Sequence, residues 1–122
     1  MRPEKKSRKE VVSDYLKLLS VSPDLQGYTY LREAILMILE DETLKFGITK
    51  QLYPRIATKF KTKWTIVERN IRHAVDKAFT VGNIETLNDI FKNISESKGK
   101  LTNAQFIATL ADYISLKEES LS

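Results

Sequence analysis

The sequence has no cysteine, a single histidine and no long apolar run, and each shortage removes a class of function. Without cysteine, the 122-residue chain has no disulfide framework and no thiolate to act as a nucleophile or metal ligand. One histidine is too few for the usual protein-built zinc sites. No stretch approaches the ~18 consecutive apolar residues of a membrane span, and the N-terminal residues lack the apolar segment of a secretory signal. The sequence therefore predicts a cytoplasmic protein without a metal or other cofactor.

Patterns typical of catalysis are also scarce. The four glycines form no phosphate-binding loop, and the sequence contains no serine–histidine–aspartate arrangement. Hydrophobic residues make up 42% of the chain, which is enough for a core and argues against wholesale disorder. The sequence predicts a single domain that is not an enzyme.

The positive charge of the chain is concentrated in its middle. Residues 45–75 carry eight basic residues against one acid, a local charge of +7, whereas the flanking segments together sum to −3 and leave a net +4. Charge focused in this way is typical of a protein that binds a polyanion, with DNA the leading candidate. The eight basic residues are Lys45, Lys50, Arg55, Lys59, Lys61, Lys63, Arg69 and Arg72.

Apolar residues recur at helical spacing along the chain, and no segment alternates as a strand does. The sequence therefore predicts an all-α fold, a six-helix bundle over residues 8–118 that follows a basic flexible tail at residues 1–7. Leu18 and Ile84 are among the residues expected to face the core. The expected helices span about 8–20, 28–41, 49–60, 63–80, 84–91 and 103–116, and a polar loop is expected at 95–100.

The third and fourth of these helices are separated only by a short turn, which predicts a helix–turn–helix over about 49–80. Thr49 is expected to cap the third helix, because its side-chain oxygen can accept from amides of the first turn. Pro54 lacks an amide donor and predicts either an early bend or a helix proper that starts near Tyr53.

Other residues mark helix boundaries. Gly27 is expected to end the connection before the second helix. The Gly82-Asn83 pair is expected to stop the fourth helix, because both residue types tolerate positive φ. The fourth helix starts either after a Thr62 cap or with a capping box formed by Thr65 and Glu68.

The fourth helix has an apolar stripe and, opposite it, a polar face suited to nucleic acid. Arginine can bond guanine O6 and N7 together, and glutamate can accept from the cytosine amino group. Residues in the N-terminal half of a recognition helix reach the major groove, while nearby cations hold phosphates. The candidate base-reading residues are Thr65, Ile66, Glu68, Arg69 and Arg72, and the candidate phosphate-binding residues are Lys50, Lys59, Lys61, Lys63 and His73.

The same residues have structural interpretations. Arg69 and Arg72 could pair with Glu68, Asp76 or other acids on a solvated face. A Glu68 carboxylate that folds back in a capping box is not free to read a base. Trp64 is expected to pack, partly buried, beside the turn.

Several motifs follow one another in a single register. They are Gly27-Tyr-Thr-Tyr-Leu-Arg-Glu-Ala-Ile35, Ile48-Thr-Lys-Gln-Leu-Tyr-Pro-Arg-Ile-Ala57 and Val67-Glu-Arg-Asn-Ile-Arg-His-Ala74, continued by Gly82-Asn-Ile and Thr102-Asn-Ala-Gln-Phe-Ile-Ala108. Together they resemble the C-terminal effector domain of the stage-zero sporulation master regulator of endospore-forming bacteria, over about residues 27–112. The resemblance implies a six-helix bundle with a helix–turn–helix that binds short asymmetric boxes of double-stranded DNA, often as a tandem dimer, and contacts RNA polymerase sigma subunits.

The resemblance places the DNA-contacting helix of the family on residues 63–73. The residues that match its pattern are Glu68, Arg69, Arg72 and His73. Two positions depart from it, because the family has an arginine at the position of Ile66 and a smaller residue at that of Trp64. Isoleucine cannot donate a hydrogen bond and can at best touch a thymine methyl, so ~1–3 kcal/mol of base discrimination is lost. A different or looser box preference follows.

The family's regulator also has an N-terminal phospho-accepting receiver domain, and no receiver fits within the residues before position 27. The chain is therefore read either as a standalone effector or as a truncated part of a longer regulator. The sequence predicts a sequence-specific transcription regulator at the nucleoid of an endospore-forming bacterium. The alternative, motivated by apolar Ile66 and Trp64, is a protein-interaction module or antagonist that binds RNA polymerase or a full-length relative.

Overall fold

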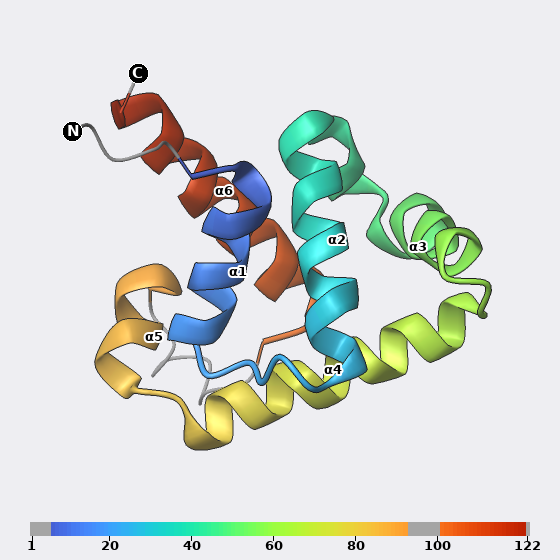
Figure 1. Ribbon diagram of the computed structural model, residues 1–122, viewed down its shortest axis with the longest axis horizontal. Coiled ribbons are helices and arrows are strands. Elements are labelled where there is room, and N and C mark those ends of the chain that lie inside the picture. The colour runs from blue at the N-terminus through green and yellow to red at the C-terminus, as the bar shows by residue number, and fades with distance from the viewer. Residues whose placement is uncertain (1–5, 93–100, 122) are drawn as a thin grey trace.

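The computed structural model describes residues 6–92 and 101–121, and this part of the chain folds into six α-helices with two short turns of other helix types and no strand (Figure 1). The expected all-α bundle is confirmed. The predicted loop at 95–100 lies outside the described residues. The elements are α1 (Arg8–Leu18), α2 (Gln26–Glu40), the 3-10 helix η1 (Glu42–Phe46), the π-helical turn η2 (Ile48–Leu52), α3 (Tyr53–Lys59), α4 (Trp64–Val81), α5 (Ile84–Ile90) and α6 (Asn103–Leu121).

The helix α2 forms the centre of the bundle. Figure 1 shows α1 and α6 on one side of α2, α3 on the other side and α4 crossing below it. Apolar residues recur along α2 at three- and four-residue steps, so one face is buried over its whole length. None of the helices within the described ranges is both long and apolar enough to span a bilayer. The buried residues of α2 are Gly27, Tyr28, Tyr30, Leu31, Ala34, Ile35 and Ile38.

Gly27 lies inside α2 and not in the connection that precedes it, which corrects the prediction. A Cβ atom on Gly27 would fall 2.8 Å from the Cβ of Ala74 and would also overlap the backbone of Asn70. The absence of a side chain therefore lets α2 and α4 approach closely. This crossing fixes the position of α4 on the bundle.

The long helix α4 presents the predicted apolar stripe to the core. The start of this helix differs from both predicted forms, since Lys63 occupies the N-cap position without a side-chain hydrogen bond. The helix ends at Gly82 as expected but without positive φ, because Gly82 has a φ of −74° and Asn83, at −73°, caps α5 instead. The residues of the stripe, all fully buried, are Val67, Ile71, Ala74, Val75 and Ala78.

The helix before the turn is built in two parts. The π-helical turn η2 contains Thr49, which forms no cap, and α3 proper begins at Tyr53 with Pro54 in its first turn. The start near Tyr53 was one of the two forms predicted from the missing amide of Pro54. A helix cap then closes α3: Lys61 adopts a φ of 55°, and the amide of Thr62 donates to the carbonyl of Ala57 at 2.9 Å.

Leu18 and Ile84 face solvent, with 55% and 60% of their surface exposed, although helical spacing predicted inward positions. Both lie at helix ends, as the last residue of α1 and the first of α5, where fewer elements cover them. The helix α6 is longer than predicted. Its last turns are held by Glu118, which accepts from the Arg8 guanidinium of α1 at 2.9 Å.

Candidate nucleic-acid interface

The side of α4 that faces away from the core is exposed and mostly polar. A helix turns 100° per residue, so positions three, four and seven apart share one face. The described neighbours leave this face uncovered, which is the first requirement of a recognition surface. The exposed residues on it are Thr65, Arg69, Arg72, His73 and Asp76.

Two predicted base readers lie on opposite flanks of that face. Glu68 is half-buried on the side of α6, and its carboxylate takes no part in a capping box. Ile66 is half-buried on the other side, where the Asn70 amide donates to its carbonyl at 2.8 Å. Ile66 does not pack against the hydrophobic core cluster. Its apolar side chain is therefore available at the edge of the face.

The two arginines of the face differ in their surroundings. Arg72 Nη1 lies 3.4 Å from the carbonyl oxygen of Leu101 and 3.7 Å from Asp76 Oδ1, which are both long contacts. Within the described residues, Arg69 forms neither a hydrogen bond nor an ion pair. The sequence left open that both arginines pair with neighbouring acids. Among the described residues, Arg72 forms such a pair with Asp76 over a long distance, and Arg69 forms none.

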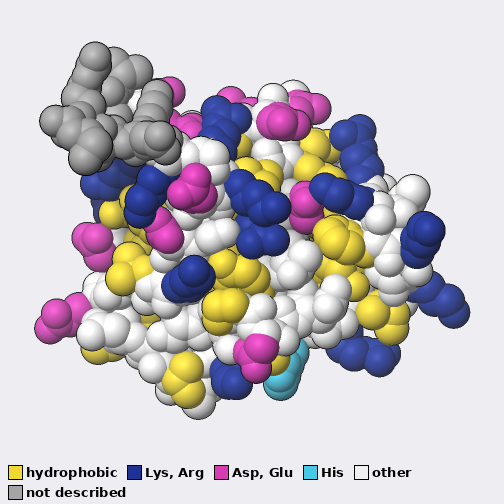
Figure 2. Space-filling model, in the orientation of Figure 1, with side chains coloured by type: hydrophobic (Ala, Val, Ile, Leu, Met, Phe, Trp, Pro, Cys, Tyr) yellow, Lys and Arg dark blue, Asp and Glu magenta, His cyan; other side chains and the backbone are white. Residues whose placement is uncertain are grey.

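The predicted phosphate-binding lysines also fall into two groups. Lys50 on η2 and Lys61 and Lys63 around the turn are exposed and form no ion pair with the described part of the chain. Lys59 Nζ instead contacts Glu33 Oε1 at 2.5 Å. Figure 2 shows Lys and Arg side chains at the end of the molecule where α3 and the turn lie.

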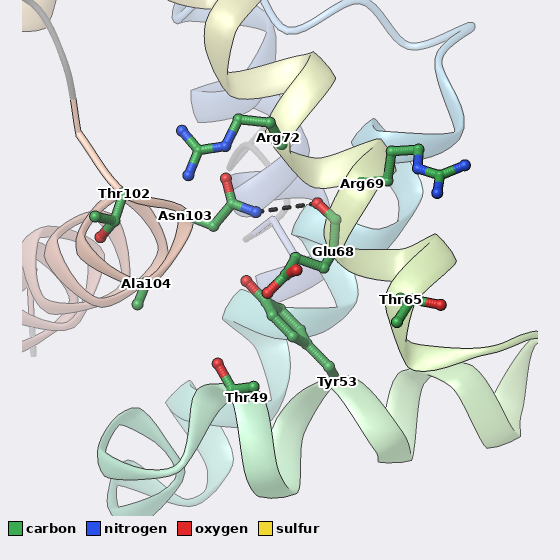
Figure 3. Close-up of a pocket in the computed structure, with 9 residues that line it drawn as sticks. All are labelled: Thr49, Tyr53, Thr65, Glu68, Arg69, Arg72, Thr102, Asn103 and Ala104. Atoms are coloured by element: carbon green, nitrogen blue, oxygen red, sulfur yellow. Dashed lines mark hydrogen bonds between the residues drawn. The ribbon is translucent and has the colours of Figure 1, made fainter.

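A cleft of about 530 Å³ borders the polar face of α4 (Figure 3). It lies between η2 and α3 on one side and the first turn of α6 on the other. Sequence reasoning found the four α4 residues but missed the others, because they come from segments distant in sequence and no local pattern shows that these segments meet. The lining residues are Thr49, Tyr53, Thr65, Glu68, Arg69, Arg72, Thr102, Asn103 and Ala104.

Tyr53 and Asn103 are the buried polar groups of this cleft. Tyr53 is 1% exposed, and this burial, partly opposed by the nearby side-chain amide of Asn103, raises the pKa of Tyr53 to about 12. Asn103 is 5% exposed, and its side-chain amide donates to the backbone carbonyl of Glu68 at 3.0 Å. The first turn of α6 is therefore hydrogen-bonded directly to α4.

A helical bundle whose exposed helix follows a short turn and carries a basic face is the architecture of a helix–turn–helix DNA-binding domain. The chain matches, over residues 12–114, the family described as sporulation initiation factor Spo0A C terminal, and it belongs to this family. The family consists of DNA-binding effector domains of a sporulation regulator and is not an enzyme family. The resemblance found in the sequence is thereby confirmed.

Proposed function

We propose that this protein is a sequence-specific DNA-binding transcription regulator in which α4 enters the major groove. The observation that carries the proposal is the exposed arginine pair on the outward face of α4, next to a turn whose two lysines form no ion pair with the described residues. Arginine on a helix in the groove can make the bidentate contact that distinguishes guanine. Lysines beside the helix start neutralise the phosphates that flank it.

We assign each residue a role from its surroundings on α4. Arg69 has no competing partner in the described structure and is assigned to a guanine. Glu68 and Thr65 border the same cleft and reach adjacent base edges, while Ile66 offers only an apolar contact to a thymine methyl. Arg72 reaches either a base or a phosphate at the α6 side of the groove.

Phosphate contacts surround these readers. Lys50, Lys61, Lys63 and His73 are exposed, and we assign these contacts to them. Lys59 contributes only if its ion pair with Glu33 opens. The resemblance implies that copies of the domain bind in tandem on double-stranded DNA and contact an RNA polymerase sigma subunit. We propose the same partners for this protein.

Selection from a random duplex pool at ~150 mM salt tests this function. A defined motif is expected, and its duplex should bind at least about 1,000-fold more tightly than a scrambled duplex of equal length. Equal binding of both duplexes would contradict sequence reading by α4.

Ile66→Arg is the matched variant for the same selection. It restores the arginine that the family has at this position, so the selected motif should gain a guanine at one place, with ~1–3 kcal/mol of added discrimination. Identical motifs from both proteins would show that position 66 does not face a base.

A second candidate function is that of an antagonist that binds RNA polymerase or a full-length relative. The observation that favours it is Trp64, which is 42% exposed at the start of α4, beside the half-exposed Ile66. Apolar side chains at this place suit a protein partner better than phosphate. Failure to select a DNA motif, together with saturable binding to a purified sigma subunit that is lost in Trp64→Ala, would favour this function.

A further inference from the structure

Asn103 joins α6 to the recognition helix through one edge of its side-chain amide. Its Nδ2 atom donates to the backbone carbonyl of Glu68 at 3.0 Å. The α6 helix does not need Asn103 as a cap, because Thr102 and Gln105 already form a reciprocal capping box with contacts of 2.9 and 3.0 Å. The buried amide therefore serves the contact with α4 and not the start of its own helix.

The other edge of this amide is unsatisfied. Asn103 Oδ1 has no hydrogen-bond partner among the described residues, although the side chain is 95% buried. A buried acceptor without a donor destabilises the fold, so a nearby group that can donate to it is a candidate partner. In Figure 3 this oxygen points to the side of the cleft on which the Arg72 guanidinium lies.

Arg72 is able to supply that donor. Its guanidinium carries five N–H groups, and its contacts to Leu101 and Asp76 are long, at 3.4 and 3.7 Å. Its side chain is also about half exposed, so a change of rotamer meets little resistance. A rotation of the side chain that carries one N–H group to the buried oxygen of Asn103 would replace these long contacts.

We propose that Asn103 is a positioning residue for Arg72: it holds the α4 backbone at Glu68 with its nitrogen and orients the Arg72 guanidinium toward DNA with its oxygen. This inference rests on the proposed function of α4. The guanidinium is a planar fork, so an acceptor on one edge fixes the plane and leaves the opposite edge for a base or phosphate. A residue outside the helix–turn–helix thereby contributes to DNA recognition.

A double-mutant cycle tests the coupling. The dissociation constant for the selected duplex is measured for the unchanged protein, Asn103→Ala, Arg72→Ala and the double variant. Asn103→Ala should weaken binding about tenfold alone, and only about threefold further in the Arg72→Ala background, where the hydrogen bond to Glu68 is all that remains to be lost. A merely structural asparagine would produce the same loss in both backgrounds, and that additive result would overturn the proposal.

Arg69 provides the matched control cycle, because it lines the same cleft but extends away from Asn103 (Figure 3). Asn103→Ala and Arg69→Ala should be additive. Equal coupling to both arginines would overturn the specific role of Arg72, as would an Arg72→Ala variant with unchanged affinity. If neither arginine variant alters binding, the proposed function itself fails. Circular dichroism checks folding, and Asn103→Ser replaces Asn103→Ala in both cycles if the alanine variant unfolds.

Discussion

Arg69 and Lys63 lie close together in the sequence, yet their positions predict different kinds of DNA contact. Arg69 lies on the outward face of α4, whereas Lys63 precedes the first turn and lies where a phosphate would meet the helix N-terminus. Arg69→Ala should cost ~1–3 kcal/mol of binding and relax the preference at one base pair. Titration of a duplex series, with each base pair changed in turn, measures both effects.

Lys63→Ala is the comparison for that series. It removes one phosphate contact, so every duplex should bind more weakly by a similar factor. If the Arg69 variant also loses the same factor on every duplex, Arg69 is a phosphate contact and not a base reader. If the Lys63 variant instead changes the preferred base, the assignment of the turn to the phosphate backbone is wrong.

Tyr53 is expected to lower the stability of the domain at alkaline pH. Burial favours the neutral phenol and raises its pKa to about 12, compared with about 10 in the unfolded chain. Between these values the unfolded state has released the proton and the folded state has not, so the free energy of unfolding falls as pH rises. The full stabilisation is present below pH ~10, and roughly 2–3 kcal/mol is lost by pH ~12.

Urea unfolding of the unchanged protein and Tyr53→Phe at several pH values between 9 and 12 isolates this contribution. Lysine deprotonation affects both proteins alike, so the difference between their unfolding free energies is the relevant quantity. That difference should shift in favour of Tyr53→Phe as pH rises. A constant difference across the range would show that the phenol ionises equally in both states.

At the scale of elements, α4 was predictable because its sequence contains a complete pattern. Five apolar residues at three- and four-residue steps define the buried side, and whatever remains must face solvent. The exposed residues of the candidate interface were predicted as those that remain outside the apolar stripe. The start of α3 near Tyr53 was one of two forms predicted from Pro54, because proline excludes a regular helix interior before it.

The missed features depend on contacts between distant elements. The turns η1 and η2 are five residues each, too short for periodicity to reveal. Gly27 was read as a local stop signal, but its role is set by Ala74 on another helix. The link from Asn103 to Glu68 spans 35 residues and leaves no local pattern. Such contacts are properties of the packed bundle and not of any single segment.

Gly27→Ala tests the close approach of α2 and α4. The added methyl would lie 2.8 Å from the Cβ of Ala74 and would meet the backbone of Asn70, neither of which can move freely. The two helices must separate, so the variant should lose ~1–3 kcal/mol of unfolding free energy. A lower urea midpoint at unchanged slope is the expected readout.

Gly47→Ala is the matched control for this substitution. A methyl there would meet only the flexible side chain of Gln51, at 3.0 Å, and Gly47 has a φ of −138°, which any residue adopts. Its unfolding free energy should change by less than about 1 kcal/mol. Equal losses in the two variants would show that the effect of Gly27→Ala comes from the backbone and not from the crossing with α4.

For the whole molecule, the uneven distribution of charge matters more than the net +4. The basic residues of η2, α3 and the turn lie toward one end of the molecule, those of α4 follow along the adjoining helix, and the remaining chain is slightly acidic. About four to six phosphate contacts predict that the logarithm of the binding constant falls with the logarithm of salt at a slope near −4 to −5. The selected and scrambled duplexes should share most of this slope, because phosphates carry no sequence.

Variants of two lysines test which side chains contribute to the slope of the salt dependence. Lys50 is unpaired within the described structure, so Lys50→Ala should reduce the slope by about 1. Lys59 already contacts Glu33, so any phosphate contact would have to replace this ion pair, and Lys59→Ala should change the slope less. A protein whose binding to DNA hardly depends on salt would contradict the electrostatic role of this end. A larger change for Lys59 than for Lys50 would instead show that the Glu33 pair opens when DNA binds.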